Sequence, residues 1–259
     1  MIRIISLGAG VQSTAMSLMA ARGDIGPMPD AAIFADVGDE PSAVYAHLEW
    51  LTSVLPFPVV VTSAGHLSAD VLAGVKMARP PLFVNDGMLG RQCTRNYKVR
   101  PIRRATRKLL GVGPKQRPPA GAAEAWIGIS MDEAIRMKPS GVAFITNRWP
   151  LIEKRMSRQD CLRWMAERQY PTPPKSSCCY CPYKSDSQWR DLRDNDADGW
   201  AKAIAFDKGV RSPKIVALYG AEGFVHRSGK PLDEVDLRTD AEAGQPDLFN
   251  NDCEGACGV

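Results

Sequence analysis

The order of apolar and polar segments predicts an α/β fold built on a doubly wound parallel sheet. Short strand-like apolar runs alternate with segments that favour helices, which is the pattern of a parallel sheet covered on both faces. A glycine loop joins the first apolar run to the first helix, and an acidic segment, residues 36–40, follows the second run. We therefore expect five or six parallel strands, with ligands bound beyond their carboxyl ends.

The first stretch, Met1 to Arg22, predicts a strand, a glycine loop and a helix N-terminus. Isoleucines supply the strand, Gly8 and Gly10 allow a tight turn, and Ser13 with Thr14 opens a helix-favouring segment. Such a junction presents backbone N–H groups, the positive end of the helix dipole and hydroxyl groups to one point, which suits a phosphate. The alternative is a plain connecting turn, since the loop matches neither the dinucleotide-binding nor the Walker pattern.

The remaining elements follow from periodicity and from Pro and Gly positions. Strands are expected at residues 31–35, 58–62, 125–129, 142–146 and 224–226, and helices at 42–55, 67–75, 157–169 and 185–206. We expect a nucleotide-binding α/β domain over residues 1–150, a helical cysteine-bearing part over 151–238 and a flexible tail over 239–259.

Composition favours a soluble chain with a full core. The 259 residues are 44% hydrophobic, yet no apolar run is long enough to span a membrane, and the chain starts with a strand rather than a signal peptide. We therefore expect a cytoplasmic protein without membrane contact. The net charge of +4 conceals a basic stretch, residues 91–117, that has no acidic residue. This stretch is either a solvated face or a binding site for phosphates of a nucleotide or nucleic acid.

Seven cysteines are too few and too clustered for a disulfide scaffold. Cys178 and Cys181 have the C-x-x-C spacing that lets two thiolates reach one metal, whereas Cys179 is expected to point elsewhere. Cys161 falls on an apolar helical face, where a core role and a ligand role are both open. Three interpretations compete for the cluster: a 4Fe-4S centre, a structural zinc ion or a redox dithiol.

Three ordered motifs resemble those of one known group of proteins. GAGVQS at residues 8–13 is similar to the S-G-G-x-D-S loop of PP-loop adenine-nucleotide hydrolases, with Ala9 and Gln12 replacing a glycine and the aspartate. Residues 93–101 resemble the C-x-x-x-x-K-x-x-P signature of the phosphoadenosine phosphosulfate (PAPS) reductase-like family. GISMDEAIR, residues 128–136, resembles that family's G-I-R-x-D-E-x-x-R segment, with Ser130 in place of an arginine.

The resemblance implies roles for individual residues. Cys93 would join the C-x-x-C pair as a cluster ligand, with Cys161 as a fourth ligand or with one iron left open, and Lys98 would lie near the cluster or the nucleotide. Cys253 and Cys257 in the tail would form a persulfide or disulfide relay or stay a passive end. Nucleotide contacts are implied for the following residues: Ser6, Gly8, Gly10, Ser13, Thr14, Phe34, Asp36, Gly128, Asp132 and Arg136.

The function implied first is ATP-dependent sulfur transfer, with ATP, Mg²⁺ and a 4Fe-4S cluster as cofactors. ATP would adenylate an oxygen of a nucleic acid or nucleotide, and sulfur delivered by the iron-sulfur cluster or a persulfide would displace AMP. A partner such as a cysteine desulfurase would supply this sulfur. The alternatives are a sulfonucleotide (PAPS/APS) reductase and a zinc-stabilised nucleic-acid-binding module without catalysis. A homodimer is an open alternative to a monomer.

Overall fold

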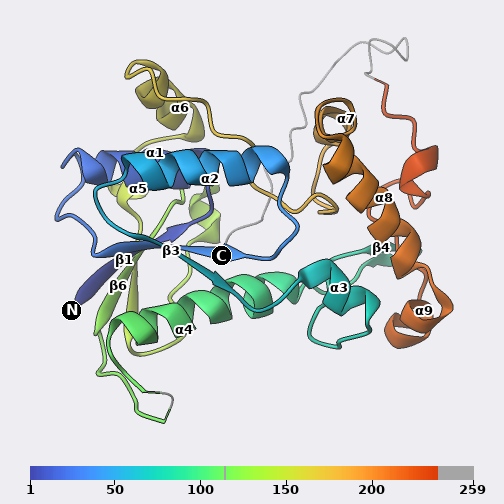
Figure 1. The fold of residues 1–259 in the computed structure, drawn as a ribbon, viewed down its shortest axis with the longest axis horizontal. Helices are drawn as coiled ribbons and strands as arrows, with labels where there is room; N and C mark the ends of the chain where they lie inside the picture. The colour runs from blue at the N-terminus through green and yellow to red at the C-terminus, as the bar shows by residue number, and fades with distance from the viewer. Residues whose placement is uncertain (114, 239–259) are drawn as a thin grey trace. The chain divides into compact units, whose positions relative to one another are not determined.

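The computed structural model describes residues 1–113 and 115–238, which form two compact units (Figure 1). Unit 1 comprises Met1–Asp36, Ala43–Ser63 and Val99–Ser176. Unit 2 comprises Val37–Ser42, Ala64–Lys98 and the described residues from 177 to 238. This division does not follow the expected boundary at residue 150, because residues 151–176 cluster with the sheet-containing unit and residues 64–98 do not.

Unit 1 is built on a five-stranded sheet in which every neighbouring pair is parallel. The strands are β1 (Ile2–Leu7), β2 (Ala31–Asp36), β3 (Val59–Ser63), β6 (Ala123–Ile127) and β7 (Ile145–Arg148). Their spatial order is β3-β2-β1-β6-β7. In the centre of the sheet, Ile4 lies opposite Ala31 of β2 and Ala125 of β6. The predicted fold class is therefore confirmed, with five strands.

Helices cover both faces of this sheet, as Figure 1 shows for α1 and α2 on one side and α4 on the other. The helices of unit 1 are α1 (Val11–Ala21), α2 (Ser42–Val54), α4 (Arg100–Leu109), α5 (Pro150–Glu153) and α6 (Arg158–Ala166). Successive side chains of β1 point to opposite faces of the sheet. Ile5 belongs to the apolar cluster of α1 and α2, whereas Ile4 packs with Ala105 of α4.

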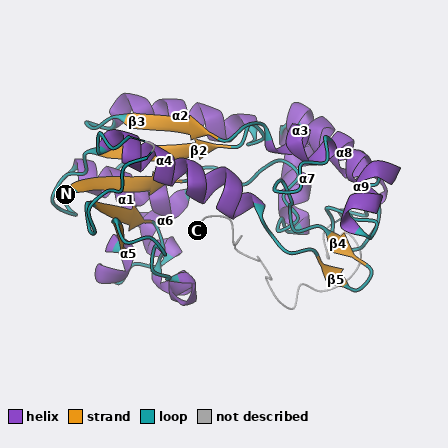
Figure 2. Ribbon diagram, turned by 90° about the horizontal axis from the view of Figure 1, so that it is seen from below, coloured by secondary structure: helices purple, strands orange, loops and turns teal. Residues whose placement is uncertain are grey.

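Unit 2 is mainly helical, with one short hairpin (Figure 2). Its elements are α3 (Leu67–Leu72), β4 (Phe83–Val84), β5 (Gly87–Met88), a π-helical segment (Thr94–Val99), α7 (Asp186–Asn195), α8 (Ala197–Val210), α9 (Pro213–Tyr219) and a 3₁₀ turn (Leu232–Glu234). Large aromatic side chains form its core. Trp189 is fully buried, and the ring of Tyr180 stacks on Phe206 with the centroids 3.7 Å apart.

Three expected elements differ from the structure. The helix expected over 185–206 is two helices, because Asp196 caps α8 by accepting a hydrogen bond from the Gly199 amide at 2.9 Å. The strand expected at 142–146 starts later, at Ile145. The strand expected at 224–226 is a single bridge between Phe224 and Phe83.

Over the described ranges 1–113 and 115–238, the structure holds no helix with the length and apolar character that a membrane crossing needs.

Candidate nucleotide and cysteine sites

The strand order places a topological switch point beside β1. From β1 the chain adds β2 and then β3 on one side, and later adds β6 and β7 on the other. The connections that leave the carboxyl ends of β1 and β6 therefore diverge, and such a crevice is where open parallel sheets bind ligands. The glycine loop follows β1, and the segment that starts at Gly128 follows β6.

The glycine loop is closed by one serine. The Ser13 hydroxyl accepts a hydrogen bond from the Gly8 amide and donates one to the Gly10 carbonyl, both at 3.2 Å. Gly10 occupies the N-cap position of α1, and no side chain of the described residues caps this end of the helix. The N–H groups of the first turn, together with the helix dipole, are therefore available to an anion.

Two further contacts fix the loop from other parts of unit 1. The Ser176 hydroxyl donates a hydrogen bond to the Gly8 carbonyl. Gly128 packs directly on the start of α1, because a Cβ atom at this position would lie 2.9 Å from the Ser13 amide nitrogen. Gly128 is thus required for close approach rather than for an unusual backbone angle, which gives the sequence motif a steric explanation.

Two residues predicted to contact the nucleotide, Thr14 and Ser6, lie in α1 and β1 rather than in the glycine loop. Thr14 is completely buried, and its hydroxyl lies 3.1 Å from Nε2 of His47 on α2. Burial lowers the pKa of His47, so this imidazole is neutral at pH 7. The Thr14 hydroxyl is therefore engaged in the core, and any phosphate contact would come from its backbone. Ser6 lies in β1, opposite Ile33 and Ile127.

Two of the three residues that depart from the family motifs, Gln12 and Ser130, contact each other. The Gln12 amide donates to the Ser130 hydroxyl at 3.4 Å, and this hydroxyl donates to the Asp132 carboxylate at 3.1 Å. The same carboxylate oxygen accepts from the Arg158 amide at 2.6 Å. Gln12 is thereby linked, through one hydroxyl, to a carboxylate that lies in an exposed position.

The other residues predicted to contact the nucleotide are distributed over β2 and the segment after β6. Phe34 is buried in β2, and Asp36 at its end accepts a hydrogen bond from the Tyr45 hydroxyl at 2.9 Å. Arg136 forms an ion pair with Glu133 within the 3₁₀ segment Met131–Arg136. Roles of these three residues in nucleotide binding stay predictions.

Three of the predicted cluster ligands belong to unit 2. Cys178 and Cys181 form one turn, in which the Cys181 amide donates to the Cys178 carbonyl at 3.0 Å. Cys93 directly precedes the π-helical segment, and both Cys93 and Cys178 pack against the apolar core of unit 2. The Cys179 side chain is buried, and burial raises the pKa of its thiol to about 11.

Tyr180 lies close to two of these thiols. Its hydroxyl donates to the buried Asp39 carboxylate at 2.7 Å, and the Cys179 amide donates to the Asp39 carbonyl at 2.8 Å. The pKa of Tyr180 is raised well above its ordinary value, first by burial and then by charge on Cys178, Asp39 and Cys93. Asp39 therefore anchors the cysteine loop at two points.

Cys161 lies on α6 in unit 1, in the apolar cluster that covers one face of the sheet. It is completely buried, and burial raises the pKa of its thiol to about 12, with smaller contributions from Asp132 and Asp160. This environment is that of a core cysteine.

Cys253 and Cys257 lie outside the described residues. Among residues 1–113 and 115–238, no three His, Cys, Asp or Glu side chains are arranged around one metal-sized site.

Lys98 forms an ion pair with Glu40 inside unit 2, with Nζ 3.2 Å from Oε1. The Glu40 side chain is 1% exposed, and its second oxygen is buried without a hydrogen-bond partner among residues 1–113 and 115–238. Two arginines of the basic stretch form hydrogen bonds to backbone carbonyl groups. Arg103 donates to the Ser140 carbonyl, and Arg107 donates to the Gly113 carbonyl. Some residues of the basic stretch therefore stabilise the fold, and Lys98 pairs with a buried carboxylate.

Sequence reasoning missed Ser176, His47 and Glu40. Ser176 meets Gly8 across 168 residues of sequence, and His47 meets Thr14 across 33. Glu40 was recognised only as part of an acidic segment. A single sequence carries no pairing signal at such separations, so only the fold reveals these partners.

No protein-family model and no curated protein sequence matches the chain. Among solved structures, a crystal structure of phosphoadenylyl-sulfate (PAPS) reductase from Candida auris, in a phosphate complex, is similar to it. The match covers 67% of this chain and 75% of that chain, at 15% sequence identity and a TM-score of 0.47. The fold assigned above rests on the strand order and register of the chain itself.

Proposed function

We propose that unit 1 binds the phosphates of an adenine nucleotide at the switch point beside β1. The observation that carries this proposal is the combination of a glycine loop after the central strand with an uncapped N-terminus of α1. Gly8 and Gly10 would let the backbone approach the phosphates, while Ser13 holds the loop in shape. Adenine specificity is taken from the resemblance of the motifs to the PP-loop family.

We further propose that the nucleotide is ATP and that the protein transfers sulfur. An oxygen of the acceptor would attack the α-phosphorus of ATP and release pyrophosphate; a sulfur nucleophile would then form a C–S bond as the C–O bond to AMP breaks. Asp132 is suited to bind Mg²⁺ in place of the missing loop carboxylate, because it connects to Gln12 through Ser130. Lys98, which pairs with Glu40 in unit 2, stays a predicted catalytic residue.

Cys93, Cys178 and Cys181 are the thiols of unit 2 proposed to hold an iron-sulfur cluster. Thiolates are the ligands that such clusters need. Cys93 and Cys178 pack against the same apolar core, and Cys181 is joined to Cys178 by a backbone hydrogen bond at 3.0 Å. When bound, the cluster would supply or carry sulfide for transfer. Cys161 is not needed for this assignment, and its place in the core of unit 1 favours a three-thiolate cluster.

Two assays on anaerobically purified protein test these proposals. Pyrophosphate release from ATP, dependent on Mg²⁺ and abolished by Asp132→Ala, would support ATP activation. About four irons and four acid-labile sulfides per chain, lost in Cys178→Ala, would support the cluster. One zinc and no sulfide would instead refute the cluster and favour a zinc-stabilised binding module.

A sulfonucleotide reductase is the second candidate, and Gln12 favours it. The amide removes a carboxylate from the loop, which suits a substrate that is not split as Mg²⁺-ATP. One tail thiolate would attack the sulfur of the substrate and release the nucleotide phosphate. The second thiol would displace sulfite as a Cys253–Cys257 disulfide forms, and an external dithiol would reduce it. Sulfite release from PAPS without pyrophosphate release from ATP would establish this alternative.

A further inference from the structure

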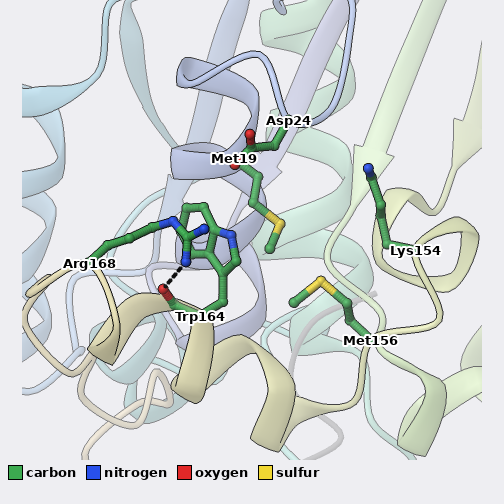
Figure 3. Close-up of a pocket in the computed structure, with 6 residues that line it drawn as sticks. All are labelled: Met19, Asp24, Lys154, Met156, Trp164 and Arg168. Carbon is green, nitrogen blue, oxygen red and sulfur yellow. Dashed lines mark hydrogen bonds between the residues drawn. The ribbon is translucent and has the colours of Figure 1, made fainter.

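A cavity lies in unit 1, near the C-terminal end of α1 and thus away from the glycine loop (Figure 3). Its volume is about 290 Å³. The cavity is lined by Met19 of α1 and by residues that follow α1, α5 or α6 or lie on α6: Asp24, Lys154, Met156, Trp164 and Arg168. This size is near the lower end of small-molecule pockets and fits one planar ring system with a substituent.

The apolar wall of the cavity consists of two flexible methionine side chains and one indole ring. Figure 3 shows the thioethers of Met19 and Met156 beside the ring of Trp164. Methionine sulfur makes favourable contacts with aromatic rings, and its flexible side chain adapts to rings of different shape. The two methionines are therefore suited to hold a flat heteroaromatic ring between them, beside the indole edge.

Trp164 is held rigidly in this position. The guanidinium of Arg168 lies 4.4 Å from the indole ring centroid, and Tyr170 stacks against the indole at 5.9 Å. Arg168 also donates to the Trp164 carbonyl at 3.0 Å. The wall of the cavity is thus formed before any ligand enters, which lowers the entropic cost of binding.

The polar groups of the cavity favour a ligand with a negative charge. Lys154 is exposed at the rim and has no ion-pair partner in the described part of the chain. The Arg168 guanidinium pairs with Glu167 at 3.3 Å, and its buried Nε–H has no hydrogen-bond partner among the described residues. Asp24 can accept hydrogen bonds from ring amino groups, and its carboxylate lies 3.7 Å from Nε of Arg22. A cation and a carboxylate in one cavity match a nucleotide, whose phosphate accepts and whose base can donate hydrogen bonds.

We propose that this cavity binds a nucleotide, with the base between Met19 and Met156 and the phosphate at Lys154. The ligand is either a free mononucleotide or one nucleotide of a single-stranded nucleic acid. The cavity starts about 14 Å from Gly10 along α1, since Met19 is nine residues further on at about 1.5 Å per residue. Under the sulfur-transfer proposal it would hold part of the acceptor, but the inference rests on the cavity alone.

The test is a titration of protein carrying ¹³C-labelled methionine methyl groups, followed by NMR. The ligands are AMP and a four-nucleotide single-stranded oligoadenylate, and the Met19 and Met156 signals are assigned with Met→Leu variants. We expect both methyl signals to shift and saturate. Lys154→Gln should weaken binding about fivefold or more, because a cation–phosphate contact is lost, and the neighbouring Arg155→Gln should leave it unchanged.

The results of the titration distinguish a free mononucleotide from a nucleic acid as the ligand. Shifts with both ligands indicate a mononucleotide site, and shifts with the oligonucleotide alone indicate a site for a polymer. The proposal is overturned if neither ligand shifts both methyl signals at millimolar concentration, or if Lys154→Gln and Arg155→Gln have equal effects. Because the methyl signals report on the cavity directly, they give a result even if pyrophosphate release from ATP is never observed.

Discussion

The close packing of Gly128 on the start of α1 gives a prediction whose size can be worked out. A Cβ atom at position 128 would lie 2.9 Å from the Ser13 amide nitrogen and 3.0 Å from its Cα, whereas ordinary contacts begin near 3.4 Å. Both atoms belong to the backbone, so Gly128→Ala must move the start of α1 by about 0.5 Å. Overpacking of this kind costs about 1–3 kcal/mol.

For a chain of this length, a loss of about 2 kcal/mol lowers the Tm by ~4–8 °C. Differential scanning calorimetry of Gly128→Ala measures this change directly. Gly113→Ala is the matched control, because a Cβ there meets only the Gln116 side chain at 3.5 Å. The same displacement disturbs the loop, so affinity for ATP should fall about tenfold or more. A Tm within 1 °C of the wild-type value would refute the packing argument.

Three further predictions concern the buried groups of unit 1. Thr14→Val should cost about 1–3 kcal/mol in urea unfolding, because it leaves His47 Nε2 unpaired, while ATP affinity changes less than twofold. The pKa of His47 is lowered from 6.5, so its neutral form stabilises the fold above pH 6.5 and this contribution is lost as the pH falls below it; urea unfolding at pH 7.5 and 5.5 should show a smaller pH effect in His47→Gln. Iodoacetamide at pH 8 should label Cys93 at least about 100-fold faster than Cys161, whose thiol is buried with a pKa of about 12; equal rates in a mass-spectrometric time course would contradict the placement of Cys161.

Local patterns in the sequence were sufficient to predict the sheet and the position of the glycine loop. The β1 region alternates apolar residues before two glycines, and β2 is apolar up to Asp36, so strand and boundary are both encoded locally. The helix break at Asp196 was missed because the segment is rich in aspartate, so no single one stands out as an N-cap. The hydrogen bond that the Gly199 amide donates to Asp196 appears only in the structure.

The candidate sites were predicted less completely, because their support comes from distant residues. The sequence indicates Gly128 as part of a motif, but its steric reason is contact with Ser13, which follows another strand. Thr14 was expected to contact phosphate through its hydroxyl, which instead meets a histidine on α2. The link from Gln12 through Ser130 to Asp132 likewise depends on two strands being neighbours in the sheet.

The central claim, that the loop after β1 binds nucleotide phosphates, is tested most directly by calorimetric titration of ATP into Gly8→Ala. The free protein accommodates this Cβ, since its nearest neighbours are the Ser13 and Ser176 hydroxyls at 3.7 and 3.9 Å. The free energy of unfolding should therefore change by less than about 0.5 kcal/mol. The account predicts that ATP affinity falls at least about tenfold, because the methyl group occupies the space of a phosphate. An unchanged affinity in a normally folded variant would contradict it.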